Sequence, residues 1–413
     1  MASVAAAADS QYPVLTRNRT FMAVWLGGLV SVLGDGFHSV ALGLWVLQVT
    51  GSASAMALIM ASRIIVSILL GAVAGTVVDR SDRRLIMIAM NLVRFVSVGA
   101  IALLIKAGVT SLAPIIALTA LTAVASQFYG PAMSASLINI VGKNELSRAT
   151  GLLQVSNTIG QMVGPFLGGA IVAVLGGWAA LSADAISFLI AGLMVLLAGS
   201  FPSPKREAGE KGNFWRDLTE GFRYIRQHPV ASSVVVTAPI INFFGNAIGV
   251  LLPVIAVKIW LANEIQFGAV EALFPAGFAI GAAAIMAFSK RLKRRGALMM
   301  GGITVAGLLI TLMALMPSVN AALPVILLCG ICMAFTNVLF QITLQSEVDP
   351  EVQGRVFGTL GSLVNIASPV AMLLAGFLGD AFSPTLIVAV AGLALGLIGL
   401  VSYLASSGLR QYN

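Results

Sequence analysis

The chain has 413 residues, of which 58% are hydrophobic and 10% are charged, and its mean hydropathy is +0.98. Soluble domains are roughly 45–50% apolar and about 25% charged, so this composition excludes a soluble globular enzyme. The 24 Lys and Arg residues outnumber the 16 Asp and Glu residues and give a net charge of +8, which in so apolar a chain indicates cytoplasmic loops rather than binding to nucleic acid.

Apolar segments separated by turn residues or charges follow one another along the whole chain. A helix needs about 20 mostly apolar residues to cross a bilayer, and each segment has about that length or more. The predicted helices cover residues 20–47, 53–78, 85–105, 112–137, 150–176, 178–200, 230–258, 264–289, 297–316, 321–344, 354–378 and 383–405. The sequence therefore predicts an all-α membrane protein with twelve transmembrane helices.

One long polar segment, residues 201–229, separates the first six predicted helices from the last six. Its second half, residues 214–226, places apolar side chains at helical spacing opposite charged ones, which predicts an amphipathic helix on the cytoplasmic membrane face or a simple linker helix. The expected organisation is a cytoplasmic tail, a six-helix bundle, a linker, a second six-helix bundle and a second cytoplasmic tail, over residues 1–19, 20–200, 201–229, 230–405 and 406–413.

The basic residues give the predicted helices an orientation. If both termini are cytoplasmic, 20 of the 24 Lys and Arg residues lie on the cytoplasmic side, and only Lys106 and Lys258 lie outside. Arg63 and Arg94 fall within the apolar spans. Because cytoplasmic loops carry an excess of basic residues, we expect both termini in the cytoplasm and the chain in a bacterial inner membrane.

An internal repeat relates the two halves of the chain. An offset of 207 residues, about half of the chain length, carries Arg148 onto Arg355 and Asp35 onto Asn242. The halves are therefore predicted to form two pseudo-symmetric six-helix bundles of parallel topology. Chains built in this way bind their ligand between the halves and work by alternating access, so the repeat indicates a transporter.

The loop between the second and third predicted helices carries a recognisable signature. It reads Gly75-Thr76-Val77-Val78-Asp79-Arg80-Ser81-Asp82-Arg83-Arg84 and resembles the G-x-x-x-D-[RK]-x-G-[RK]-[RK] motif A of the major facilitator superfamily. Asp82 stands where the family prefers Gly. The resemblance implies a cytoplasmic gate of Gly75, Asp79, Arg80 and Arg84, with Asp79 accepting hydrogen bonds from the start of the eleventh helix near Gly354. A solvated loop that only sets topology is the alternative.

A second signature lies in the fifth predicted helix, which reads Gly160-Gln161-Met162-Val163-Gly164-Pro165-Phe166-Leu167-Gly168-Gly169. It resembles the family's antiporter motif C, with Gly160, Gly164, Pro165 and Gly168 in the matching positions. The alternative is close helix packing without directional meaning. Other stretches, such as residues 127–132, 144–149, 220–225 and 354–358, are similar to the branch of drug and siderophore exporters that holds the macrolide efflux proteins and enterobactin exporters.

Ionisable side chains inside the apolar spans are candidates for function, because charges there are costly unless paired or solvated. Asp35 lies near the middle of the first helix and His38 lies one turn further on. We expect Asp35, His38, Arg63 and Arg94 to handle protons. In the competing interpretation, Asp35 is a structural ion-pair partner of Arg63 or Arg94.

Polar and aromatic side chains on the same faces are candidates for a substrate cavity. They are Ser31, Trp45, Gln127, Asn242, Asn246 and Glu271. In the alternative interpretation, Asn242 and Asn246 form hydrogen bonds between helices and do not line a cavity. Asp184 and Glu271 are placed in the first turns of their helices, where a carboxylate suits the helix N-terminus. The fourth helix lacks the arginine that many proton-coupled drug antiporters of the family carry.

These features favour a secondary active transporter, a proton-coupled exporter of hydrophobic or amphipathic drugs, macrolides or siderophores, acting as a monomer in the lipid bilayer. A lysophospholipid or lipid flippase of the same superfamily is the alternative. A membrane-embedded enzyme is disfavoured because no catalytic motif occurs. No cofactor or metal site is expected, since Cys329 and Cys332 have no further Cys or His nearby.

Overall fold

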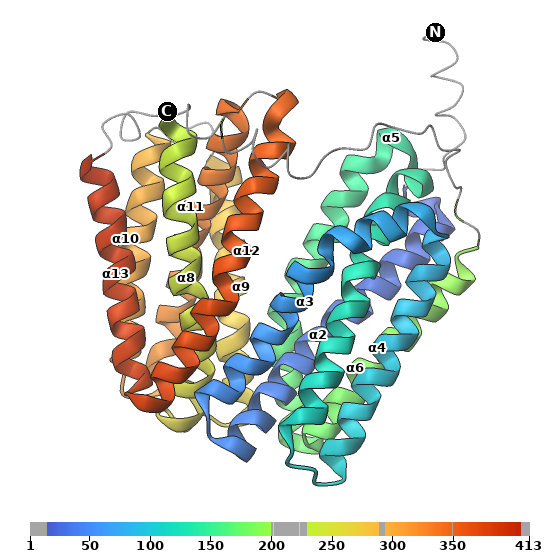
Figure 1. Ribbon diagram of the computed structural model, residues 1–413, viewed down its shortest axis with the longest axis horizontal. Coiled ribbons are helices and arrows are strands. Elements are labelled where there is room, and N and C mark those ends of the chain that lie inside the picture. Colours follow the sequence, from blue (N-terminus) through green and yellow to red (C-terminus); the bar gives the residue numbers. More distant parts are fainter. Residues whose placement is uncertain are drawn as a thin grey trace. The chain divides into compact units, whose positions relative to one another are not determined.

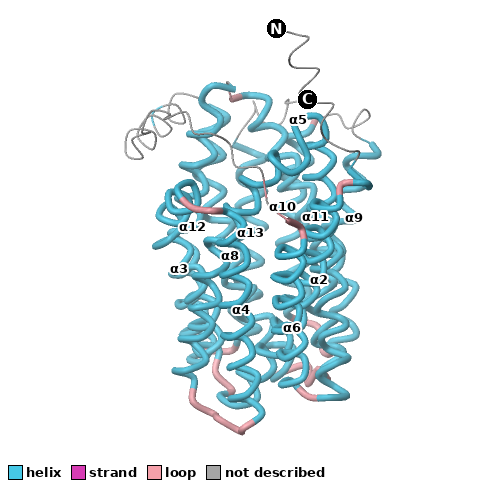
Figure 2. Tube along the Cα trace, turned by 90° about the vertical axis from the view of Figure 1, so that its right-hand side faces the viewer, coloured by secondary structure: helices cyan, strands magenta, loops and turns pink. Residues whose placement is uncertain are grey.

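A computed structural model describes residues 15–199, 201, 223, 229–288, 294–348 and 350–405. All regular elements among these residues are helices (Figure 2), which confirms the predicted all-α membrane fold. After a short 3-10 helix, η1 (Leu15–Arg17), come α2 (Arg19–Thr50), α3 (Ala53–Arg80), α4 (Arg83–Lys106), α5 (Leu112–Leu175), α6 (Gly177–Leu197), α8 (Pro229–Lys258), α9 (Glu264–Phe288), α10 (Arg295–Ala314), α11 (Val319–Glu347), α12 (Pro350–Ala381) and α13 (Pro384–Ala405).

Helix α5 contains both the fourth and the fifth predicted spans. Its 64 residues would extend roughly 96 Å if straight, about three times the thickness of a bilayer core. The run is broken at Gly142, whose φ of 76° and ψ of 168° are not helical and whose positive φ suits glycine. Eleven described helices are long and apolar enough to cross a membrane, and the break in α5 provides the twelfth span.

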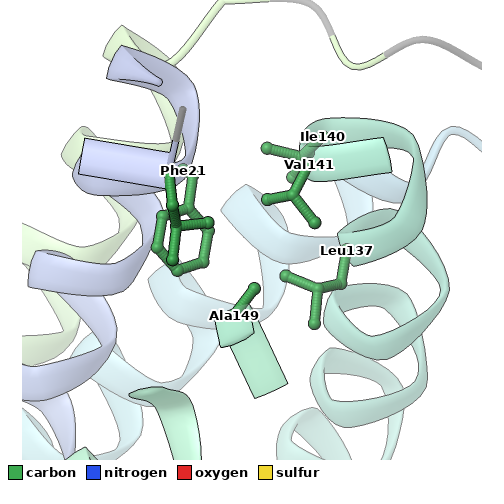
Figure 3. Close-up of a cluster of buried hydrophobic side chains, with 6 residues drawn as sticks. Phe21, Leu137, Ile140, Val141 and Ala149 are labelled. Atoms are coloured by element: carbon green, nitrogen blue, oxygen red, sulfur yellow. The ribbon is translucent and has the colours of Figure 1, made fainter. Parts of the chain in front are cut away.

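A hydrophobic cluster packs around this break. Phe21 at the start of α2 lies beside Leu137, Ile140, Val141 and Ala149 of α5 (Figure 3). The side-chain amide of Asn18 also donates a hydrogen bond to the Ile140 carbonyl at 2.7 Å. The start of α2 is therefore fastened to the bend, and the two parts of α5 are held on either side of it.

The chain divides into two compact units. The first contains residues 1–49 and 62–207, and the second contains residues 50–61 and 208–413. Helix α3 therefore contributes its first turns to the second unit and the rest of its length to the first. The predicted amphipathic helix at 214–226 and most of the predicted linker and tails lie outside the described residues.

Packing within the units follows the predicted repeat. In the first unit α4 packs against α5 and α6, and in the second unit α10 packs against α11 and α13 (Figure 1). Helices α4 and α6 are the third and sixth predicted spans, and α10 and α13 are the ninth and twelfth. Equivalent positions in the two halves therefore make equivalent contacts, which supports the parallel repeat.

Candidate functional site

The first unit contains a cavity of about 650 Å³ whose walls come from α2, α3, α4 and α5. Both parts of α5 contribute, because the bend at Gly142 turns the two parts toward the same space. The charged side chains in its lining are Asp35, Arg63 and Arg94. The polar groups beside them include Trp25, Ser31, Ser126, Tyr129, Ser134, Thr150, Gln154, Ser156 and Asn157.

Arg94 is a buried cation held by aromatic rings. Only 5% of the residue is exposed, and its guanidinium lies 4.3 Å from the centre of the Tyr129 ring and 4.6 Å from that of Phe188. Its Nη2 donates to Asn91 Oδ1 at 3.0 Å, whereas its Nε has no hydrogen-bond partner among the described residues. Contacts with ring faces stabilise a desolvated cation, yet one strong donor of Arg94 stays unsatisfied.

Asp35 is exposed to the same cavity. It forms no direct ion pair with Arg63 or Arg94 in the described part of the chain, although it lies within electrostatic range of both. Two cations and one anion therefore share one cavity without a closed salt bridge. The direct ion pair of Asp35 with Arg63 or Arg94, which is the alternative interpretation of the sequence, is therefore not formed among the described residues.

His38 has a different partner from the one the sequence suggests. Its Nδ1 lies 3.0 Å from Asp184 Oδ2 on α6, and both side chains are buried. The pair is placed in the wall between α2 and α6, and His38 is not in the cavity lining. Asp184 is the eighth residue of α6, beyond the first turn, so a role at the helix N-terminus is wrong for Asp184 and its bond to His38 replaces it.

The remaining cavity candidates divide between the two units. Ser31 lines the cavity, whereas Trp45 is buried and Gln127 half-buried away from it. The other three belong to the second unit: Asn242, Asn246 and Glu271. Asn246 Nδ2 donates to Ser368 Oγ on α12 at 3.1 Å. Glu271 is the eighth residue of α9, also beyond the first turn, and is half-buried without a hydrogen bond or ion pair to any described residue.

The motif A residues lie where α3 ends and α4 begins. Asp79 is exposed and sits 3.9 Å from Arg83, Arg80 is exposed and Gly75 is half-buried. Arg84 donates to the carbonyls of Val195 and Leu196 at 3.4 and 2.7 Å and so anchors the end of α6. The expected contact of Asp79 near Gly354 involves the other unit and stays a prediction.

The departure of this loop from the family pattern has a structural cause. Asp82, where the family prefers Gly, is the N-cap of α4, and its carboxylate accepts from the backbone N–H groups of Arg84 and Leu85 at 2.9 and 3.2 Å. Aspartate is among the strongest N-cap residues. Asp82 therefore starts α4 and fixes the position from which Arg84 reaches α6.

The motif C glycines form the contact between α5 and α2. A Cβ atom added to Gly164 would lie 3.0 Å from Gly36 Cα, and one added to Gly168 would lie 2.9 Å from Phe37 Cα. In the other direction, a Cβ atom on Gly36 would lie 2.8 Å from Pro165 Cδ. The glycines thus let two backbones touch, directly beside Asp35.

Several lining residues went unnoticed in the sequence, notably Trp25, Tyr129, Gln154 and Asn157. Trp25 donates its indole N–H to Ser156 Oγ at 2.8 Å. Thr150, Gln154 and Asn157 recur at helical spacing within an otherwise apolar span, and such a polar stripe is the signal by which this face of α5 could have been found.

Comparison with known proteins agrees with this architecture. The model of the Major Facilitator Superfamily matches residues 24–372. Macrolide efflux protein A of Streptococcus pyogenes is 24% identical over 364 residues, covering 87% of this chain and 89% of the relative. The multidrug efflux pump Tap of Mycolicibacterium fortuitum is 26% identical, covering 89% and 90%. The enterobactin exporter EntS of Salmonella choleraesuis is 25% identical, covering 97% and 95%.

Solved structures share the fold at lower identity. A bacterial homologue of the human lysosomal transporter Spinster superposes with a TM-score of 0.73 at 14% identity, covering 95% of this chain and 98% of that one. A bacterial homologue of the iron transporter ferroportin gives 0.69 at 16% identity, covering 94% and 99%.

Proposed function

Because the chain belongs to the Major Facilitator Superfamily, we propose that it is a secondary active transporter that exports hydrophobic or amphipathic small molecules in exchange for protons. The chain is a multi-pass membrane transporter and not an enzyme. Its relatives include efflux proteins named for macrolides, for multiple drugs and for enterobactin. The direction of export is the part of the proposal that these relatives support.

The observation that carries the proposal is the cavity with three charged side chains in its lining. Its volume of about 650 Å³ lies within the usual range of roughly 300–1,000 Å³ for small-molecule sites. Apolar side chains such as Val24, Leu29 and Met133 supply most of the contact area, and the polar groups orient the ligand. Asp35, Arg63 and Arg94 are costly in a membrane and therefore mark a pathway for substrate or protons.

Proton coupling is assigned to Asp35. Ionised Asp35 is attracted to Arg63 and Arg94, which face the same cavity, and protonated Asp35 is not. The balance of charge in the cavity therefore changes by one unit with each proton, and a substrate sees a different site in the two states. His38 contributes by holding α2 to α6 through Asp184, which fixes the backbone that carries Asp35.

The same proposal assigns the gate and the membrane. Gly75, Asp79, Arg80 and Arg84 act at the cytoplasmic end of the first unit, and Gly160, Gly164, Pro165 and Gly168 set the contact of α5 with α2. The protein works as a monomer in the bacterial plasma membrane with both termini in the cytoplasm. The positive-inside distribution of Lys and Arg supports this orientation.

The test uses inside-out vesicles from bacteria that produce the full chain. A panel of macrolides, cationic dyes and siderophores is first screened by growth of cells with and without the protein. Compounds whose effect on growth depends on the protein are then followed in vesicles. Accumulation that requires an inwardly acid pH gradient and collapses with an uncoupler supports the proposal. Transport that ignores the gradient would contradict proton coupling and favour a flippase or facilitator.

A further inference from the structure

The charge and shape of the cavity point to a more specific ligand class, an inference that rests on the proposed transport function. We propose that Arg94 and Arg63 form a subsite for an anionic oxygen group, such as a carboxylate, phosphate or catecholate, on an otherwise apolar substrate. Both arginines line the cavity and neither is paired with a carboxylate among the described residues.

Arg94 is the centre of this subsite. It is more than nine-tenths buried, its guanidinium lies over the rings of Tyr129 and Phe188, and among the described residues Asn91 alone accepts a hydrogen bond from it. Its Nε is buried without a hydrogen-bond partner in the described part of the chain, and the side chain borders the cavity. A planar guanidinium with free donors matches the geometry of carboxylate and phosphate oxygens.

Arg63 and Asp35 set the charge around Arg94. Arg63 lies exposed to the cavity from α3 and supplies the second cation, whereas Asp35 on α2 supplies the one anion among the described lining residues. The remaining acidic group nearby, Asp184 on α6, is engaged by His38. Two cations against one anion disfavour a cationic ligand, because a like charge in a desolvated site is repelled.

The test measures equilibrium binding to the purified full chain in detergent, with three probes of matched size: pyrenebutyrate, pyrenebutanol and pyrenebutylamine. The wild type is expected to bind pyrenebutyrate about tenfold or more tightly than pyrenebutanol, with the amine weakest. Arg94→Gln is expected to remove this preference, and Arg63→Gln is expected to reduce it. The matched control is Lys106→Gln. Lys106 lies on α4, as Arg94 does, but its ammonium group contacts the Trp178 ring away from the cavity.

Several results would overturn the inference. Equal affinities for the three probes, preference for the amine, or no saturable binding of pyrenebutyrate would each do so. Arg94 also packs against two rings, so Arg94→Lys, which keeps the charge, is included to separate charge from folding. Arg63→Gln gives an independent reading because Arg63 is exposed. Binding requires no pH gradient, so failure of this inference is distinguishable from failure of proton-driven export.

Discussion

Two kinds of charged residue occupy the apolar part of the first unit. Asp35, Arg63 and Arg94 face the cavity without direct ion pairs among the described residues, whereas His38 and Asp184 are joined in the wall at 3.0 Å. Side chains of the first kind are available to a ligand or a proton. His38 and Asp184 instead bind each other and link α2 to α6. We therefore expect mutations of the cavity residues and mutations of this pair to have different effects.

Removal of the wall carboxylate is expected to destabilise the protein. Asp184→Ala deprives His38 of its partner in a buried site, and the loss of a buried hydrogen bond to a charged group costs about 1.5–3 kcal/mol. The midpoint of thermal unfolding of the purified protein should fall by roughly 5 °C. Ser182→Ala on the same helix is the control, because among the described residues its hydroxyl bonds only the Trp178 carbonyl of its own helix. An unchanged midpoint for Asp184→Ala would refute the structural role of the pair.

The sequence predicted which polar side chains lie in the apolar spans but not which of them meet. Asp35, Arg63, Arg94 and Ser31, which all lie in predicted apolar spans, line one cavity. His38 was expected beside Asp35, one turn away on the same helix. A separation of three residues along a helix still leaves about 60° between side chains, and that angle is enough for His38 to reach Asp184 on α6 instead.

Among the elements, the contact of α2 with α5 is the most demanding. Gly36 and Gly164 touch through their backbones, and a Cβ atom on Gly36 would lie 2.6 Å from Gly164 Cα. The glycines therefore hold the segment that carries Asp35 at a fixed distance from the wall formed by α5.

A single methyl group at this contact is expected to be poorly tolerated. Gly36→Ala forces the two backbones apart and should cost about 1–3 kcal/mol, typical of overpacking. Thermal unfolding and transport by the variant are measured beside Gly151→Ala on α5, where a Cβ atom meets nothing within 4 Å. Equal stability of the two variants would mean that α2 and α5 are not in close contact.

The end of α12 caps the start of α3 within the second unit. Asp380 accepts hydrogen bonds from the N–H groups of Ala53 and Ser54 at 2.6 and 3.0 Å and from the Ser52 hydroxyl at 2.7 Å. The first four N–H groups of a helix lack partners within the helix. This carboxylate therefore satisfies two of them from another helix.

Loss of this cap should appear as faster amide exchange. Asp380→Ala is expected to cost about 1 kcal/mol at the N-terminus of α3 and to speed hydrogen exchange of the amides of Ala53 and Ser54 about fivefold or more. Ser383→Ala serves as the control, since the Ser383 hydroxyl contacts Thr385. Unchanged exchange at Ala53 and Ser54 in Asp380→Ala would show that the carboxylate does not cap α3.

At the scale of the whole molecule, most of the fold could be predicted from hydropathy alone. Apolar segments of spanning length predicted the helices. The offset of 207 residues predicted the repeat, which the packing of α4 with α6 and of α10 with α13 supports. The continuity of α5 could not be predicted, because residues 138–149 read as a polar connection. Helical turns continue up to Gly142 and resume after it, since the cluster around Phe21 buries Ile140, Val141 and Ala149 on either side of the break.

The orientation of the whole chain is tested by fusions at its ends. With 20 of 24 basic residues assigned to the cytoplasmic side, a green fluorescent protein fused after Asn413 should fluoresce. An alkaline phosphatase fused at the same position should be inactive, because that enzyme needs the periplasm to form its disulfides. The opposite pattern would reverse the assigned topology and the cytoplasmic position of motif A.

The central claim is that a proton on Asp35 drives transport through the cavity. The most direct measurement compares wild type and Asp35→Asn in proteoliposomes, with one substrate from the growth panel followed under an imposed pH gradient and in exchange at equal pH. We predict that Asp35→Asn loses gradient-driven accumulation and keeps exchange, because its cavity is intact but cannot cycle a proton. Accumulation by Asp35→Asn equal to that of the wild type under the same gradient would contradict the account.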